Sequence, residues 1–155
     1  NQKGFEDYLN LKRVAISFFV LIVIIEIAFA IIFILGSEFF PWLYLSNDNS
    51  TDVIETVKIA SKLLIVVAIF QVFDGIQVVA QGCLRGIQDV KIPSIICFFS
   101  YIIFGLPVMV YLGLYTELKA VGVWIGFLFG LAASSLFLSS RFFMMCNRII
   151  LNNGK

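Results

Sequence analysis

Four long apolar runs, separated by short polar segments, dominate the pattern of this 155-residue chain. They cover residues 14–35, 63–84, 93–114 and 120–145. Each run is close to the roughly 20 residues that an α-helix needs to cross about 30 Å of hydrocarbon. Asp52 and the polar residues around it suit a helix N-terminus, which predicts that the second helix begins near residue 52, outside the hydrocarbon. The pattern predicts an all-α integral membrane protein with four transmembrane helices.

The segment between the second and third runs carries residues typical of a helix-to-helix turn. Arg85 and Asp89 are four positions apart and could form an ion pair at a helix end, where Gly86 could release the chain. Pro93 suits the first turn of the third helix, and Pro107 predicts a kink farther along it. We interpret the turn as structural, with a hinge between moving lobes as the functional alternative.

Small residues recur every four positions in the last run, a spacing that lets one membrane helix approach another closely. These residues are Gly122, Gly126, Gly130 and Ser134. We expect Gly82 and Gly86 to act in the same way at the end of the second run. This pattern is common in membrane helix bundles and says little about function.

Composition and charge agree with a membrane location, because 61% of the residues are hydrophobic and 14% are charged. Of the 11 lysine and arginine residues, eight lie near the two termini or between the second and third runs. Loops that stay in the cytoplasm keep an excess of such residues. Both termini are therefore expected to be cytoplasmic, in a multi-pass protein of the plasma or inner membrane. Nothing in the charge pattern indicates nucleic-acid binding.

Cysteine and histidine usage argues against most enzyme and metal sites. The chain has no histidine, and its three cysteines are not spaced as zinc ligands. We interpret Cys83, Cys97 and Cys146 as small packing residues. An intramembrane enzyme would want a nucleophile with a base, or a pair of aspartates, and only one aspartate lies in mid-span. We expect no enzymatic activity, no cofactor, and no metal beyond a possible Na⁺.

The second run contains one acid and three amides on a single helical face. Gln71, Asp74, Gln77 and Gln81 are separated by three or four positions. Such a stripe should face protein or a watered cavity, since each unpartnered polar group in hydrocarbon costs several kcal/mol. The amides could simply bond to neighbouring helices. Asp74 is a stronger candidate for an ion or substrate site, because an intramembrane ionisable residue usually has a function.

Glu26 lies at a similar depth in the first run, so Glu26 and Asp74 could meet. Two neighbouring carboxylates would share a proton or hold a small cation such as Na⁺. The alternative is that Glu26 is protonated and packed between helices.

Three ordered motifs follow one another along the chain. They are FDGIQVVAQGCLRGIQDVKIP at residues 73–93, S-Y-x-x-x-G-L-P at residues 100–107 and G-x-W-x-G-x-x-x-G-L at residues 122–131. Together they resemble the multidrug and toxic compound extrusion family, the MATE transporters, and the first is similar to the tenth membrane helix of that family and the loop after it. The resemblance covers essentially the whole chain and corresponds to helices nine to twelve of a twelve-helix transporter.

The resemblance implies an antiporter for drugs or other small organic, often cationic, compounds, with two six-helix lobes and driven by Na⁺ or H⁺. Asp74 matches the acid that contributes to the cation site of the C-terminal lobe. The family's companion glutamate belongs to the seventh helix, Glu26 is outside the family's motif, and Phe70 stands where some relatives have tyrosine. A flippase for lipid-linked oligosaccharides with a related fold is the alternative, although few cationic residues are available for its anionic substrate.

Overall fold

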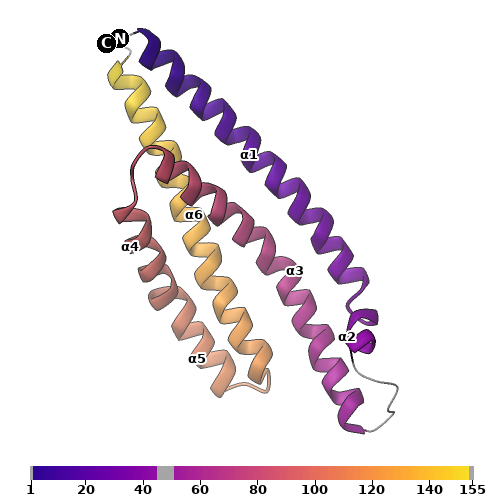
Figure 1. Cartoon of the computed structure of the whole chain (residues 1–155). Coiled ribbons are helices and arrows are strands. Elements are labelled where there is room, and N and C mark those ends of the chain that lie inside the picture. The colour runs from indigo at the N-terminus through magenta and orange to yellow at the C-terminus, as the bar shows by residue number, and fades with distance from the viewer. Residues whose placement is uncertain (1, 45–50, 154–155) are drawn as a thin grey trace.

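The computed structural model describes residues 2–44 and 51–153, with side chains over residues 10–43 and 52–151. The described residues form helices and connecting turns only (Figure 1). The elements are α1 (Gln2–Leu35), α2 (Phe39–Tyr44), α3 (Thr51–Gly86), α4 (Lys91–Ser100), the π-helical turn η1 (Tyr101–Gly105), α5 (Leu106–Leu114) and α6 (Lys119–Asn153). Four stretches are long and apolar enough to cross a membrane, with α4, η1 and α5 forming one of them. The all-α fold with four membrane spans is thus confirmed.

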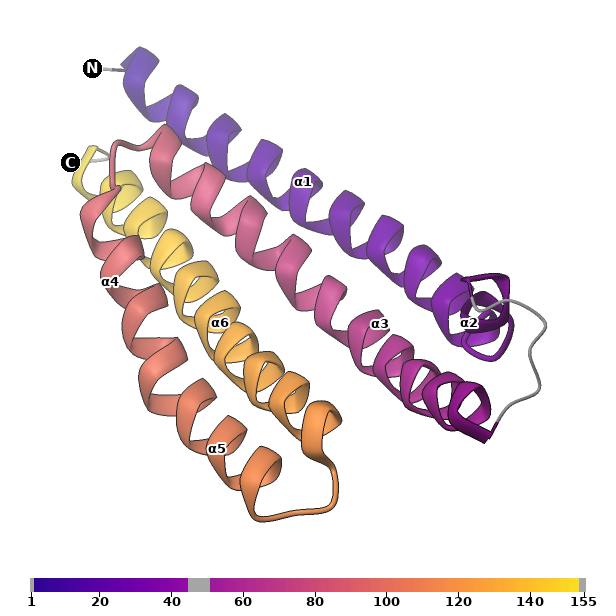
Figure 2. The ribbon, with the colours of Figure 1, turned by 60° about the horizontal axis from the view of Figure 1, so that its bottom comes forward.

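The spans run alternately up and down, so that the start of α1 and the end of α6 lie at one end of the bundle together with the α3–α4 turn (Figure 1). We call this the terminal end. At 34 residues, α1 is about 51 Å long, well beyond the hydrocarbon thickness. Figure 2 shows α3 between α1 on one side and α6 on the other, with α4 and α5 along the far side of α6. The main packing contacts join α3 with α6, α5 with α6, and α1 with α3.

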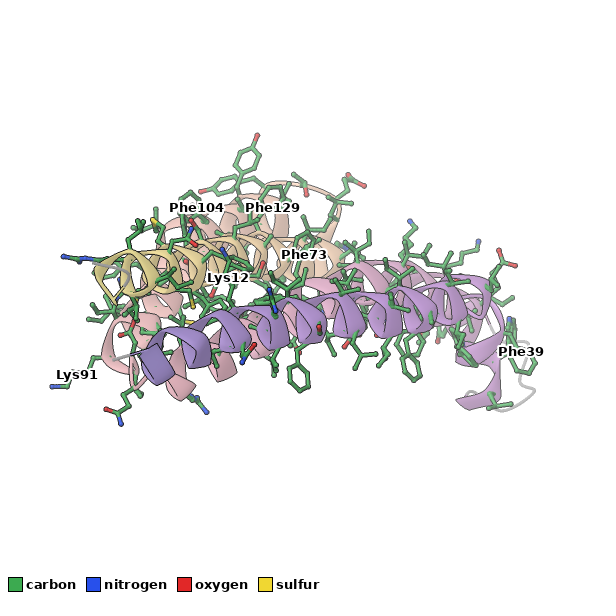
Figure 3. The ribbon with its side chains drawn as sticks, turned by 90° about the horizontal axis from the view of Figure 1, so that it is seen from above. Lys12, Phe39, Phe73, Lys91, Phe104 and Phe129 are labelled. Atoms are coloured by element: carbon green, nitrogen blue, oxygen red, sulfur yellow. The ribbon has the colours of Figure 1, made fainter. Side chains whose placement is uncertain are left out.

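Much of the apolar surface is exposed in the described chain. Figure 3 shows side chains projecting outward all around the bundle, and Phe39, Phe104 and Phe129 are 63%, 43% and 54% exposed. A membrane span can display such residues because lipid tails are as apolar as they are. The buried core is small and lies toward the terminal end, where Ala80, Leu84, Leu138, Phe142 and Cys146 pack together.

Glycines of α6 bring its backbone against the third span, as predicted. A Cβ added at Gly122 would lie 2.5 Å from the carbonyl oxygen of Leu112, and one added at Gly130 would lie 3.2 Å from the Cα of Gly105. The prediction for Gly82 and Gly86 was wrong. Both have no atom within 4 Å of an added Cβ, because they border a cavity of about 320 Å³ between α1 and α3.

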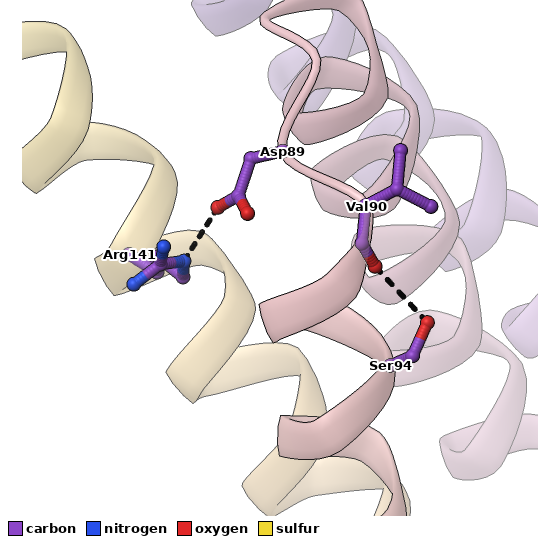
Figure 4. Close-up of polar contacts among 4 residues, drawn as sticks. All are labelled: Asp89, Val90, Ser94 and Arg141. Carbon is purple, nitrogen blue, oxygen red and sulfur yellow. Dashed lines mark hydrogen bonds and ion pairs between the residues drawn. The ribbon is translucent and has the colours of Figure 1, made fainter.

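The α3–α4 turn differs from the sequence prediction in its ion pair. Asp89 is paired with Arg141 of α6, at 2.6 Å between Nε and Oδ2, instead of with Arg85, whose side chain is exposed (Figure 4). The chain leaves α3 through Gln88, which has φ of 63°, so Gly86 is not the residue that supplies the left-handed conformation. The amide of Asp89 donates to the carbonyl of Leu84 and the amide of Gln88 to that of Arg85, the two bonds of a Schellman motif.

Two further features were not predicted. The apolar segment after α1 forms the short helix α2, which contacts α3 at the end opposite the termini. The third span also contains a π-helical turn, η1, directly before Pro107. Kinks in helices commonly occur at prolines and at such π-turns, and here the two are adjacent.

Candidate functional site

The polar stripe of α3 is divided between two neighbouring helices. Toward α1, Gln71 donates from Nε2 to the backbone oxygen of Glu26 at 3.3 Å. Half-buried Glu26 lies against Gly75, since a Cβ added at Gly75 would be 2.9 Å from its Cγ and 3.0 Å from its Oε1. Gly75 therefore leaves the space in which the Glu26 side chain fits. This contact places Glu26 against the residue that follows Asp74 in the chain.

Toward α4 and α6, the other two amides meet a cysteine. Gln77 and Gln81 each donate from Nε2 to the sulfur of Cys97, at 3.6 and 3.2 Å. The hydroxyl of Ser134 on α6 donates to the same sulfur at 3.3 Å. We call Gln77, Gln81, Cys97 and Ser134 the Cys97 cluster. It joins three helices by polar contacts inside a mostly apolar bundle.

Asp74 lies on α3 between these two groups, and its side chain is exposed. Val78, one turn farther along the same side of α3, is 61% exposed. Tyr101 at the start of η1 is close enough to Asp74 to feel its charge, and it also lies beside Gln77. We expected the whole stripe to face protein or a watered cavity. The amides do face protein, whereas no described helix covers Asp74.

The carboxylates of the residues that the structure describes do not by themselves form a metal centre. Among the described residues, no group of three or more histidine, cysteine, aspartate or glutamate side chains lies together. Asp74 and Glu26 come from adjacent helices and are the two acids nearest mid-span. Additional ligands for a cation would have to come from amide oxygens, water or another part of a larger protein.

Comparison with known proteins decides the family. The MatE family model matches residues 1–111. This chain belongs to the MatE family. Its relatives include the "Probable multidrug resistance protein NorM" of Xylella fastidiosa (strain Temecula1), 34% identical over 143 residues, which cover 92% of this chain and 29% of that protein. The namesake from Agrobacterium fabrum (strain C58) is 32% identical over 146 residues, covering 94% of this chain and 31% of the relative.

A third MatE relative, the "Multidrug resistance protein NorM" of Burkholderia vietnamiensis, is 34% identical over 120 residues, or 77% of this chain and 26% of that protein. The chain thus spans about three tenths of the length of the first two relatives. Membership in MatE and the four apolar spans make it a multi-pass membrane protein.

In this MatE chain, the structure adds three residues to the site that the sequence did not single out. Cys97 was interpreted as a packing residue, and it does pack against the core that contains Cys146, but its sulfur also accepts hydrogen bonds from Gln77, Gln81 and Ser134. Ser134 was noted only as a small residue, and Tyr101 only as part of a motif. A signal was present for Ser134, since a hydroxyl at the end of a small-residue face can bond to the adjacent helix.

Proposed function

We propose that this chain is part of a secondary active exporter that moves small organic compounds, many of them cationic, out of the cell in exchange for Na⁺ or H⁺. The observation that carries the proposal is Asp74, an ionisable side chain in a membrane span that no described helix covers. Leaving a carboxylate exposed to lipid is costly, so such residues usually face a bundle interior or a water-filled cavity. Relatives named as multidrug resistance proteins support export of drug-like substrates.

The chain would supply helices nine to twelve of a twelve-helix transporter, within its C-terminal six-helix lobe. Its length, about three tenths of its relatives, agrees with that assignment. The uncovered side of α3 would then face the remaining helices of the lobe or the cavity between the lobes. With both termini and the α3–α4 turn at one end, the lysine and arginine distribution favours a cytoplasmic terminal end, in the plasma or inner membrane.

Within this proposal Asp74 binds or releases the coupling cation. Glu26 is a second carboxylate at the same site, held next to Gly75, while Gln71 fixes the α1 backbone at that point. Gln77 and Gln81 supply amides on the other side. A cation bound here would alter the balance between outward- and inward-facing states because it interacts with them unequally.

A lipid-linked oligosaccharide flippase, the alternative considered from the sequence, is not favoured. The relatives carry the name multidrug resistance protein, and the mid-span groups described here are acids and amides, which do not suit an anionic headgroup.

The test uses the full-length transporter reconstituted in vesicles, with dye export followed under imposed Na⁺ or H⁺ gradients. Asp74→Asn keeps the size of the side chain and removes its charge, and we expect gradient-driven export to be lost at unchanged protein level. Asp52→Asn is the matched control, because it is the same change in the exposed first turn of α3. Undiminished export by Asp74→Asn would contradict the proposal, and the gradient that drives the wild type identifies the ion.

A further inference from the structure

One buried polar atom of the Cys97 cluster lacks a partner. Gln77 is only 9% exposed, and its Oε1 has no hydrogen bond from any residue that the structure describes. A buried carbonyl oxygen without a donor costs about 1–3 kcal/mol. An acceptor kept in this state inside a membrane span is suited to a cation or to a water molecule that accompanies one.

The same cluster borders a cavity that leads toward the terminal end. The cavity has a volume of about 260 Å³ and lies between α3 and α4. Gln81 and Cys97 line its inner part, and Arg85, Val90 and Ser94 line the part next to the α3–α4 turn. Since a water molecule occupies about 30 Å³ of liquid, the cavity has room for several.

Polar groups therefore follow one another from Asp74 to the terminal end of the bundle. Asp74 and Gln77 lie one turn apart on α3, and Gln77 contacts Cys97, which lines the cavity. Two other cavities near this end, of about 400 and 320 Å³, are lined mainly by apolar side chains and include no member of the cluster.

We propose that the Cys97 cluster and the cavity beside it form the route by which the coupling cation, Na⁺ or a hydrated proton, passes between Asp74 and the terminal end. This inference rests on the proposed function and adds a path to it. The deep lining groups of the cavity are the neutral amide of Gln81 and the thiol of Cys97, which can solvate a cation without trapping it. Arg85 is exposed at the rim, where water and salt screen its charge.

Sided thiol labelling tests the route. The full-length transporter would carry Cys97 as its sole cysteine, with Cys83→Ala and Cys146→Ala among the replacements. Methanethiosulfonate reagents react with thiols in contact with water, so a small cationic reagent added at the terminal-end face should modify Cys97 and inhibit export. A protein with Cys146 alone is the control and should stay unmodified, because that side chain is fully buried. No modification of Cys97 from that face overturns the route.

Two comparisons make the test specific for a cation path through this cavity. After correction for reactivity with free thiols, the cationic reagent should modify Cys97 at least about tenfold faster than an anionic one of similar size. Gln81→Leu, which replaces an amide of the lining by an apolar group, should slow both labelling and gradient-driven export about tenfold, while Gln81→Asn should retain most of both. Equal labelling by the two reagents, or full export by Gln81→Leu, would contradict the route.

The outcome separates the two proposals. Loss of export in Asp74→Asn together with an unreactive Cys97 keeps the antiporter and rejects the route. Full export by Asp74→Asn rejects the proposed coupling site whatever Cys97 does, and the route then loses its starting point.

Discussion

Replacing Gly122 by alanine should separate α6 from the third span. The added Cβ would lie 2.5 Å from the carbonyl oxygen of Leu112 and 2.6 Å from its carbonyl carbon. Cβ atoms in proteins essentially never come closer than 3.0 Å to such atoms, so the backbones must move apart by at least 0.5 Å. The added Cβ is fixed to the main chain of α6, and the atoms that it meets belong to the main chain of α5. A change of side-chain rotamer therefore cannot relieve the clash.

The size of the stability loss in Gly122→Ala follows from how membrane helices associate. Lipid supplies no hydrophobic drive for this contact, so close packing has to stabilise it. A gap of 0.5–1 Å forfeits about a quarter to a half of the dispersion energy of each contact, and overpacking of this kind usually costs about 1–3 kcal/mol. The gain in helix propensity from glycine to alanine, about 1 kcal/mol, offsets part of it. We expect Gly122→Ala to lower the free energy of unfolding by up to about 2 kcal/mol.

The assay is thermal unfolding of the purified full-length transporter in detergent, followed by the loss of its monodisperse gel-filtration peak. Gly82→Ala is the matched control, because an added Cβ there has no neighbour within 4 Å in this chain. The control should match or exceed the wild type in melting temperature, whereas Gly122→Ala should melt several degrees lower. If Gly122→Ala is as stable as Gly82→Ala, the close approach of α6 to the third span is wrong.

Three further changes test local features by the same melting assay. Gln88→Gly should stabilise the protein by about 0.5–1 kcal/mol, since glycine adopts the φ of 63° seen at Gln88 without strain; a lower melting temperature would argue against the left-handed turn. A double-mutant cycle of Asp89→Asn and Arg141→Gln should give a coupling energy of about 1 kcal/mol for this partly buried pair, and additive effects would mean that the pair contributes nothing. Gly75→Ala should displace the Glu26 side chain and destabilise the protein, and Glu26→Ala should restore much of the loss; failure of that rescue would contradict the packing of Glu26 on Gly75.

The fold could be predicted because the membrane leaves few alternatives. Backbone groups in hydrocarbon must bond within their own segment, so each apolar run of sufficient length becomes a helix. The partner of Asp89 could not be predicted in this way. Arg85 is near in sequence, but Arg141 is brought near only by the packing of α6 along α4, which helical periodicity does not encode.

The polar stripe on α3 could be predicted for the same reason. Helical spacing puts Gln71, Asp74, Gln77 and Gln81 on one face of a helix, because that depends on one helix alone. It could not tell which neighbour each would contact, and the structure divides the amides between α1 and α4. The hydrogen-bond donors to the sulfur of Cys97 come from two other helices, α3 and α6. The residues next to Cys97 in the sequence therefore do not reveal these contacts.

The π-helical turn η1 bears on which insertions and deletions the third span can accept. The amide of Leu106 donates to the carbonyl of Tyr101, five residues back, whereas an α-helical amide donates four residues back. This turn therefore holds one residue more than an α-helical turn. Removing one residue from 102–104 would restore regular helix and keep both flanking segments facing as they do now. It would also press the ring of Pro107 against a carbonyl on the preceding turn. A deletion at this point should therefore be tolerated together with Pro107→Ala, whereas one in the middle of α6 would turn every later side chain by about 100°.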